Sequence, residues 1–235
     1  GLTDLFIGGS SGRWQYLDVD QRLTLLDQWI RAGRGRFNLI YHVGAIETDD
    51  AVTLSREAAS RGIEELGVFV HANNSTDPID HVIQTLDRIA QASPQAKLYY
   101  YHMPARGSAD FFVHELLQHA ADRLPTLAGL KFTHENLFDW RVCNKEFADR
   151  YQLYFGRDEI LISAMICGAH GAIGTCYGLV APQYRKIVEH TLAGKLDQAF
   201  EAMDTIVPFI KFLIQNGLPA MNSLMKTQGV DLGDD

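Results

Sequence analysis

Short apolar runs alternate with longer amphipathic stretches along the whole chain. The apolar runs, rich in β-branched and aromatic residues, are Leu5–Ile7, Phe37–Val43, Leu66–Val70, Leu98–Tyr101, Leu130–Thr133, Tyr151–Phe155 and Ala172–Thr175. Runs of this length predict strands of a parallel sheet, which is buried on both faces. Because they recur every ~20–33 residues with helical patterns between them, the sequence predicts repeated βαβ units.

Two of the intervening helices carry clear start or stop signals. The first can be capped by Asp18 or Asp20, and Gly33 or Gly35 can end it. Another is predicted to begin at Asp77-Pro78, since proline suits the first position of a helix.

The order of the units leaves two folds open, an open doubly wound sheet and a (β/α)8 barrel lacking one unit. Polar residues follow nearly every predicted strand: Ser10-Ser11, His42, His71, Tyr101, Lys131–Thr133, Asp158-Glu159 and Thr175. A barrel gathers all its strand ends around one mouth, where enzymes of this fold place their chemistry. This favours a TIM (β/α)8 barrel that lacks one βα unit.

The domain organisation follows from the same pattern. Residues 1–181 are predicted to form the seven barrel units, and residues 182–235 a C-terminal helical segment packed on the barrel, mostly helical over 182–228. No linker of biased composition divides the chain, so a single domain is expected. The chain starts at Gly1 and enters a strand-like run at once, so we expect a piece of a longer protein.

Composition narrows the class of partner. The 235 residues carry a formal net charge of -8 with 46% hydrophobic residues, which is ordinary for a globular protein and argues against nucleic-acid binding. No apolar run approaches the ~20 residues of a membrane span. The three cysteines have neither disulfide nor zinc spacing, which favours a reducing cytoplasm.

The segment Gly129–Thr133 places Lys131 at a predicted strand end among apolar neighbours. A solvated amine has a pKa of ~10.4 and is protonated at neutral pH. Desolvation favours the neutral amine, which can attack a ketone. A salt-bridged or snorkelling lysine is the alternative that this residue alone leaves open.

The segments Tyr99–Pro104 and Gly8–Gly12 also end predicted strands. Only one or two of the three tyrosines can face the mouth, because side chains alternate along a strand, and core packing competes with a catalytic phenol. Two serine hydroxyls and turn N–H groups suit a carboxylate, although glycine–serine turns are common. The turn matches neither a Walker A loop nor a dinucleotide fingerprint, so no nucleotide is expected.

The remaining polar candidates have ordinary explanations. The acidic residues of Phe155–Glu159 open a predicted helix, where they complement its dipole. His42 and His71 are expected to be hydrogen-bonded structural groups, since no partner spacing indicates a metal site. His114 and His119 lie on a predicted helix and are expected to be solvated.

In combination, five segments resemble the pyruvate-dependent aldolases of the dihydrodipicolinate synthase/N-acetylneuraminate lyase family. They are Gly8–Gly12, Tyr99–Pro104, Gly129–Thr133, Phe155–Glu159 and Gly168–Thr175, and the resemblance spans essentially the whole chain. The lysine and Tyr-His-Met-Pro segments are its specific part. The Gly-x-Asp-Glu pattern after the predicted sixth run points to the N-acetylneuraminate lyase branch.

The resemblance implies a role for each matching residue. Lys131 would form an imine with a 2-keto acid, and Tyr101 would move the proton. Ser10 and Ser11 would bind the carboxylate. No cofactor and no metal is implied, because the covalent imine is itself the electron sink.

The sugar end of the substrate is assigned in the same way. Gly156, Asp158 and Glu159 would hold the polyol, with Thr175 beside them, and Thr133 would line the sugar site. The resemblance thus implies a cytoplasmic class I lyase, a homo-oligomer and by analogy a tetramer, that cleaves N-acetylneuraminate to N-acetylmannosamine and pyruvate. A 2-keto-3-deoxy-sugar-acid aldolase, a dihydrodipicolinate-synthase-like enzyme and a truncated silent homologue are the alternatives.

Three departures from the family pattern bear on this expectation. Compared with the family, a βα unit before the Gly-Gly-Ser strand is absent, so the resemblance implies that residues 1–181 are units two to eight of a barrel lacking its first βα unit. The tail stops at residues 229–235, short of the family's closing segment. Arg13 replaces the family's glutamate after the serine turn, and the loop 71–75 lacks a tyrosine. Proton relay and oligomer packing are therefore less firmly implied than imine formation.

Overall fold

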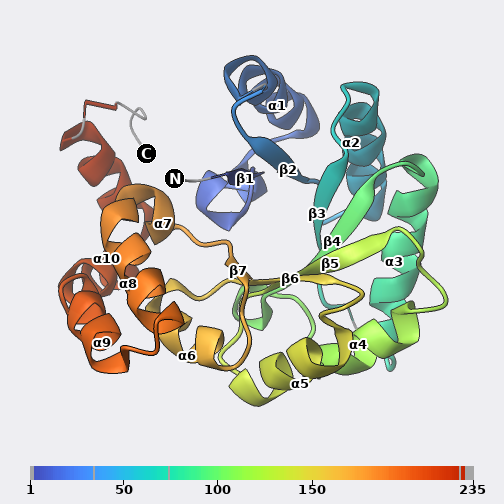
Figure 1. Cartoon of the computed structure of the whole chain (residues 1–235). Coiled ribbons are helices and arrows are strands. Elements are labelled where there is room, and N and C mark those ends of the chain that lie inside the picture. Colours follow the sequence, from blue (N-terminus) through green and yellow to red (C-terminus); the bar gives the residue numbers. More distant parts are fainter. Residues whose placement is uncertain (1–2, 34, 74, 228, 231–235) are drawn as a thin grey trace. The chain divides into compact units, whose positions relative to one another are not determined.

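The computed structural model describes residues 3–33, 35–73, 75–227 and 229–230. Its strands form one sheet in the order of the sequence: β1 Asp4–Ile7, β2 Asn38–His42, β3 Glu65–Phe69, β4 Lys97–His102, β5 Leu127–Phe132, β6 Gln152–Phe155 and β7 Gly171–Ala172. Every pair of neighbours is parallel. The predicted parallel α/β sheet is confirmed, and it curls as in half of a barrel (Figure 1).

The last predicted strand, Ala172–Thr175, was wrong in its extent. β7 ends at Ala172, and Thr175 is the N-cap residue of the short helix that follows. The paired register ends where Ala172 meets Phe155, the final residue of β6, and one last bond follows it, from the Ile173 N–H to the Phe155 carbonyl at 2.9 Å.

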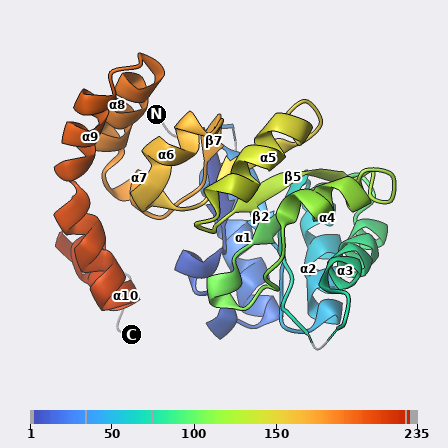
Figure 2. The ribbon, with the colours of Figure 1, turned by 90° about the horizontal axis from the view of Figure 1, so that it is seen from below.

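Helices connect the strands as the sequence predicts. The α-helices between strands are α1 Val19–Gly33, α2 Thr48–Ser60, α3 Pro78–Ala92, α4 Val113–Ala120, α5 Leu137–Phe147 and α6 Leu161–Ile166. The 3-10 helices are η1 Ser10–Gly12, η2 Trp14–Tyr16, η3 Pro104–Arg106 and η4 Asp158–Ile160. Figures 1 and 2 show α1 to α5 following one another outside the strands of the sheet.

The predicted helix starts are confirmed by their hydrogen bonds. The carboxylate of Asp18 accepts a bond from the backbone N–H of Gln21 at 2.8 Å. The carboxylate of Asp77 accepts one from Asp80 N–H at 2.9 Å, with Pro78 in the first helical position. Each bond satisfies an N–H group that has no partner inside its helix.

The chain forms two compact units. Unit 1 comprises residues 1–157 and 163–174 and holds the whole sheet; unit 2 comprises residues 158–162 and 175–235. The helices that follow β7 are α7 Cys176–Leu179, α8 Ala181–Leu192, α9 Leu196–Asp204 and α10 Val207–Thr227. Helices therefore occupy most of residues 176–227, while Gln228 lies outside the described residues.

The interior of unit 1 is aromatic toward one face of the sheet. Trp14, Phe69 and Tyr101 form a buried cluster, and Phe6 and Met103 pack against it. This cluster fills the space at the carboxyl ends of strands β1, β3 and β4, which is the end where a (β/α) fold places its site.

Candidate functional site

Tyr101 and Lys131 lie side by side at the carboxyl ends of neighbouring strands. They are register partners in the β4–β5 ladder, so their side chains leave the same face of the sheet. Gly129, two residues before the lysine, could carry no Cβ, because that atom would lie 2.1 Å from the Gln152 carbonyl oxygen and 2.8 Å from the Tyr99 ring. The glycine thus allows β5 to pack tightly beside both neighbouring strands.

The Lys131 amine is buried between two aromatic rings. The side chain is 7% exposed, and Nζ lies 4.1 Å from the ring centroid of Phe6 and 3.9 Å from that of Tyr101. Aromatic faces attract a cation, and they also keep water from the nitrogen. The predicted lysine is therefore a buried amine in an aromatic cage and not a surface ion pair.

Both the ring and the hydroxyl of Tyr101 make contacts that fix the position of the side chain. Its ring meets Phe6, His42 and Phe69 edge to face, with centroids 5.6 to 5.9 Å apart. Its hydroxyl donates to Met103 Sδ at 3.0 Å and lies 3.4 Å from Ser10 Oγ. Among three successive tyrosines, Tyr101 is the one beside Lys131.

The pKa of Tyr101 reflects opposing influences. Burial raises it, but the charge of Lys131 and the hydrogen bond with Ser10 oppose burial and bring the pKa below the ordinary value of 10.0. Its neighbours Tyr99 and Tyr100 have no such balance. Burial raises the pKa of both phenols well above the ordinary range. The electrostatics therefore distinguish Tyr101 as the phenol suited to proton transfer.

The glycine–serine turn brings Ser10 to this tyrosine. Gly8 has a φ of +67°, a left-handed conformation that glycine adopts without strain. Ser10 then opens η1, half-buried, while Ser11 is exposed. Arg13, the residue that departs from the family pattern, also has a positive φ, of +57°. Ser10, Tyr101, Lys131 and Glu159 are expected to converge at one mouth; Ser10 and Lys131 both lie against Tyr101, while Glu159 lies in unit 2 and its part in this group stays a prediction.

Thr133 and Gly156 approach each other closely at the ends of β5 and β6. A Cβ built on Gly156 would lie 1.9 Å from Thr133 Oγ1, so only glycine fits here. Thr133 Oγ1 is buried and has no hydrogen-bond partner of good geometry among the described residues. Its nearness nevertheless contributes to the lowered pKa of Tyr101. Thr133 thus belongs to the same group as Tyr101 and Lys131.

The other predicted sugar-binding residues, Asp158, Glu159 and Thr175, lie in unit 2. One carboxylate oxygen of Asp158 accepts a bond from Cys176 N–H at 2.7 Å, at the start of α7. Glu159 is half-buried in η4, and Thr175 is exposed. Asp158 therefore supports the start of α7 in addition to any role at a ligand. The roles of all three residues at a sugar stay predictions.

Residues that the sequence analysis did not select complete the surroundings of the amine. Phe6 forms one wall of the cage, and Trp14 packs 5.3 Å from the His42 ring. Buried Arg22 donates to the His42 carbonyl at 2.6 Å and to the Gly44 carbonyl at 3.0 Å. A single aromatic residue in a strand or an arginine in a helix does not by itself indicate a functional site. Phe6 and Arg22 are recognised only once the order of the strands is known.

The expectations for the histidines are confirmed in part. His42 is buried, and its Nδ1 lies 3.5 Å from Arg22 Nη2, but its Nε2 has no hydrogen-bond partner in the described part of the chain. His71 packs against Phe69, but its Nε2 has no hydrogen-bond partner among the described residues. The expectation that His114 is solvated was wrong. Its Nδ1 lies 2.6 Å from the buried Asp139 carboxylate, which also accepts the backbone N–H of Val113, because the two helices α4 and α5 pack together.

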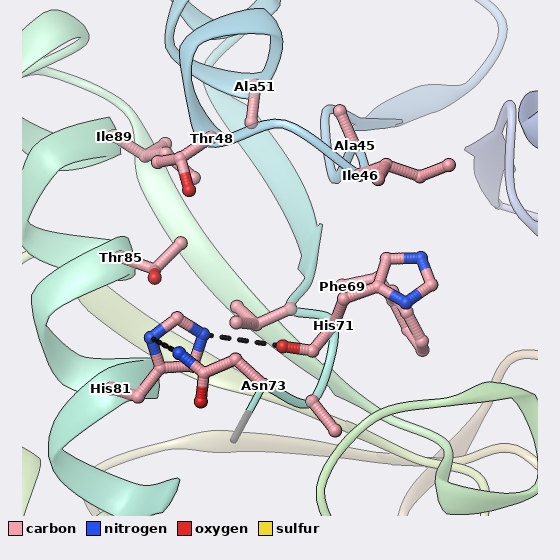
Figure 3. A pocket seen from close by; sticks show the side chains of 12 residues that line it. Ala45, Ile46, Thr48, Ala51, Phe69, His71, Asn73, His81, Thr85 and Ile89 are labelled. Atoms are coloured by element: carbon pink, nitrogen blue, oxygen red, sulfur yellow. Dashed lines mark hydrogen bonds between the residues drawn. The ribbon is translucent and has the colours of Figure 1, made fainter. Parts of the chain in front are cut away.

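A separate cavity of about 280 Å³ lies where β2 and β3 meet α2 and α3 (Figure 3). His81 spans it, contacting the His71 carbonyl at 3.3 Å and the Asn73 amide at 3.0 Å. None of the predicted site residues lines this cavity. It borders the tyrosine-free loop 71–75, of which Asn74 lies outside the described residues.

Comparison with known proteins bears on what this arrangement can do. The family model described as "Dihydrodipicolinate synthetase family" matches residues 1–234. N-acetylneuraminate lyase of Mus musculus is 31% identical over 219 residues, which are 92% of this chain and 68% of the relative. That of Xenopus tropicalis is 29% identical over 99% of this chain and 77% of the relative.

Solved structures agree with the sequence relatives. N-acetylneuraminate lyase of Proteus mirabilis has a TM-score of 0.94 at 26% identity, over all of this chain and 80% of that one. The sialic acid aldolase of Aliivibrio salmonicida has a TM-score of 0.94 at 27% identity, over all of this chain and 78% of that one. The helices of the described residues all fall short of the length or apolar character of a transmembrane span. The resemblance drawn from the sequence motifs is confirmed: the chain belongs to the dihydrodipicolinate synthetase family.

Proposed function

We propose that this chain is a class I aldolase that cleaves N-acetylneuraminate to N-acetylmannosamine and pyruvate through an imine on Lys131. The observation that carries the proposal is the buried amine between Phe6 and Tyr101, beside the hydroxyl pair of Tyr101 and Ser10. Relatives and structural neighbours that are N-acetylneuraminate lyases support it.

The keto-acid end of the substrate meets the residues of unit 1. The hydroxyls of Ser10 and Ser11 bind the carboxylate, which brings C2 of the open-chain sugar acid to the lysine. Neutral Lys131 attacks C2, and loss of water leaves a protonated imine. This cation lowers the barrier to breaking the adjacent carbon–carbon bond, because it accepts the electron pair that the bond releases.

Proton transfer then completes the cleavage. The C4 hydroxyl proton passes to Tyr101 in its phenolate form, which a lowered pKa makes more accessible. The C3–C4 bond breaks, giving the aldehyde N-acetylmannosamine and an enamine on Lys131. Tyr101 returns its proton to C3, and water hydrolyses the resulting imine to release pyruvate. The water molecule released when the imine forms is balanced by the one consumed when the imine is hydrolysed, and the Lys131 amine is restored.

The polyol end is assigned to a second group of residues. Thr133 and Gly156 line the start of the sugar site, where the close contact between them sets its width. Asp158, Glu159 and Thr175 accept or donate hydrogen bonds to the sugar hydroxyls. Carboxylates and hydroxyls are suitable partners for a polyol because each hydroxyl needs a replacement for its bond to water.

We further infer how the chain corresponds to the family fold. The seven strands represent units two to eight of a (β/α)8 barrel, within residues 1–181. The C-terminal helical segment of the same single domain is assigned to residues 182–235, of which 228 and 231–235 lie outside the described residues. The TM-score of 0.94 over the full chain supports this correspondence.

The chemistry requires only a small-molecule 2-keto acid or sugar acid and no dissociable cofactor, since the imine supplies the electron sink. A homotetramer in the cytoplasm is the proposed setting for this step of carbohydrate metabolism. Free thiols at Cys143, Cys167 and Cys176 suit a reducing compartment. Large apolar side chains exposed on α9 and α10, among them Phe200 and Phe212, suit burial against another subunit.

The test is reductive trapping of the imine. The protein is incubated with pyruvate and borohydride, digested, and searched by mass spectrometry for a reduced pyruvyl group. The adduct is expected on Lys131 and is expected to be lost in Lys131→Arg, because a guanidinium stays protonated and cannot form an imine. Lys97→Arg, an exposed lysine on β4, is the matched control.

Release of N-acetylmannosamine from N-acetylneuraminate is measured in the same preparations. An adduct on a different lysine, or none at all, would overturn the assignment of Lys131. Trapping with pyruvate but turnover only of shorter 2-keto-3-deoxy sugar acids would replace the substrate and keep the mechanism.

A further inference from the structure

A second group of reactive side chains lies outside the proposed active site. His102 ends β4, Asp110 lies in the loop before α4, and His134 follows β5 by two residues. One ring nitrogen of each histidine and one carboxylate oxygen of Asp110 all lie within 4.8 Å of one another. Donor atoms bound to one zinc ion at ~2.0–2.2 Å are roughly 3.3 Å apart, so small side-chain rotations would complete the arrangement.

The two groups are separated by the sheet itself. Side chains alternate along a strand, so His102 and Phe132 point to the opposite face from Tyr101 and Lys131. On this face the His102 ring lies 5.6 Å from Phe132 and 5.6 Å from His134 between centroids. The histidine pair therefore belongs to the helix-covered face and is no part of the imine site.

His102 is the member that most needs a partner. It is fully buried, and its Nε2 has no hydrogen-bond partner among the described residues. A buried ring nitrogen without a partner is costly to keep, and a metal ion would satisfy it.

The surroundings suit a bound cation. The Tyr100 hydroxyl lies 3.5 Å from His102 Nδ1, a contact that orients the ring as neighbouring groups commonly orient metal-ligating histidines. Phe111 packs 5.4 Å from the His102 ring and limits access of water. Glu135 Oε2 lies 3.9 Å from His134 Nε2 and adds negative charge near the ligands, although Glu135 also pairs with Arg157.

We propose that His102, Asp110 and His134 bind a divalent transition-metal ion, for which Zn²⁺ has the most suitable ligand preference. Two imidazoles and one carboxylate are a common ligand set for this ion, with water in the remaining position. This site goes beyond the proposed function. Its role is structural: it ties the loop 103–112 to the ends of β4 and β5. Met103 in this loop accepts the Tyr101 hydroxyl, so the ion would also steady a neighbour of the reacting tyrosine.

The experiment is a zinc titration of the full chain after removal of metals with a chelator. A chromophoric zinc indicator measures the affinity, and thermal unfolding is followed with and without Zn²⁺. The variants are Asp110→Asn and His134→Gln, which lie at or near the surface and spare buried His102. His119→Gln, an exposed histidine on α4, is the control.

We expect one Zn²⁺ per chain and an unfolding temperature that rises on binding. Each variant should weaken binding by at least about 100-fold, while the control binds like the wild type. Co²⁺ in place of Zn²⁺ should give absorption bands of a low-coordinate site that the variants lose.

Equal affinity in the variants and the wild type would mean that the ion binds elsewhere and would overturn the proposal. Absence of stoichiometric binding would do the same. Preference for another divalent ion with the same dependence on Asp110 and His134 would support the site and change only the metal. Pyruvate trapping on Lys131 is measured in parallel and does not depend on the outcome.

Discussion

Lys131 Nζ lies 3.9 Å from the centroid of the Tyr101 ring, and the two residues are register partners on neighbouring parallel strands. The ladder, and not a flexible loop, therefore sets the distance between the proposed nucleophile and the proposed proton carrier. Sites built on strands hold such geometry more tightly than sites built on loops. The predictions below separate the contributions of the residues around this pair.

Tyr101→Phe should separate proton transfer from packing. The ring and its contacts with Phe6 and Phe69 remain, while the hydroxyl is lost. We expect kcat for N-acetylneuraminate cleavage to fall by ~10²–10⁴-fold, the usual contribution of a general acid or base. The measurement is steady-state turnover beside borohydride trapping with pyruvate, in which Lys131 should still be labelled. A kcat within a few-fold of the wild type would move the proton relay to another group.

The position of this pair could be predicted because parallel strands repeat a simple rule. Apolar runs mark the strands, the residues at their carboxyl ends meet, and Lys131 and Tyr101 each end a run. The alternation of side chains also decides which tyrosine of Tyr99–Tyr101 faces the lysine, once the register is known. The strand ends follow from the spacing of the chain, whereas the choice of Tyr101 also needs the register of the two strands.

Other features depend on packing that no local pattern encodes. The Phe6 ring on β1 lies over Gly67 on β3, two strands away, and it fits there because the glycine has no side chain. This packing, which places Phe6 beside Lys131, is not visible in the local sequence. His102, Asp110 and His134 come from three separate parts of the chain, so no metal-ligand spacing in the sequence indicates the group. His114 was expected to be solvated on its helix, but its ring contacts Asp139 of the next helix.

Gly156→Ala tests the close contact at the end of β6. The added Cβ would meet Thr133 Oγ1 at 1.9 Å and Thr133 Cβ at 2.9 Å, so backbone or side chain must shift. We expect the free energy of unfolding to fall by ~1–3 kcal/mol, as in other overpacked sites. Urea denaturation checks this, with Gly178→Ala as the control, because an added Cβ there meets no atom within 4 Å.

Thr133→Ala in the Gly156→Ala background supplies the double-mutant test. Removing Oγ1 should recover part of the lost stability, since the shortest contact disappears. Additive losses in the double variant would show that Gly156 is required for its backbone alone.

His42 should make stability depend on pH. Burial above all, with the positive charges of Arg22 and Lys131 facing the ring, lowers the pKa of His42 well below 6.5; Tyr101 is the other titratable group against it. The folded protein therefore keeps the ring neutral while the unfolded chain binds a proton as the pH falls through 6.5. Stability is full above that pH and falls below it, by at most ~1.4 kcal/mol per pH unit from this group.

Urea denaturation at several pH values between neutral and mildly acidic measures that slope. His42→Gln should reduce the slope, whatever its effect on absolute stability, because glutamine does not titrate. His119→Gln should leave it unchanged, as this side chain is exposed on α4. An unaltered slope in His42→Gln would assign the acid sensitivity to other groups.

Glu159→Ala tests how the sugar end is recognised. A site built to bond hydroxyls loses transition-state stabilisation when one partner is removed, and each buried unpaired group costs ~1–3 kcal/mol. Turnover of nine-carbon sialic acids should therefore fall by roughly one to two orders of magnitude, at ~1.4 kcal/mol per tenfold. Trapping of pyruvate alone should survive, because Lys131, Tyr101 and Ser10 handle the keto-acid end. Equal loss in both assays would assign Glu159 to the fold of unit 2, and no loss in either would favour a shorter keto-acid substrate.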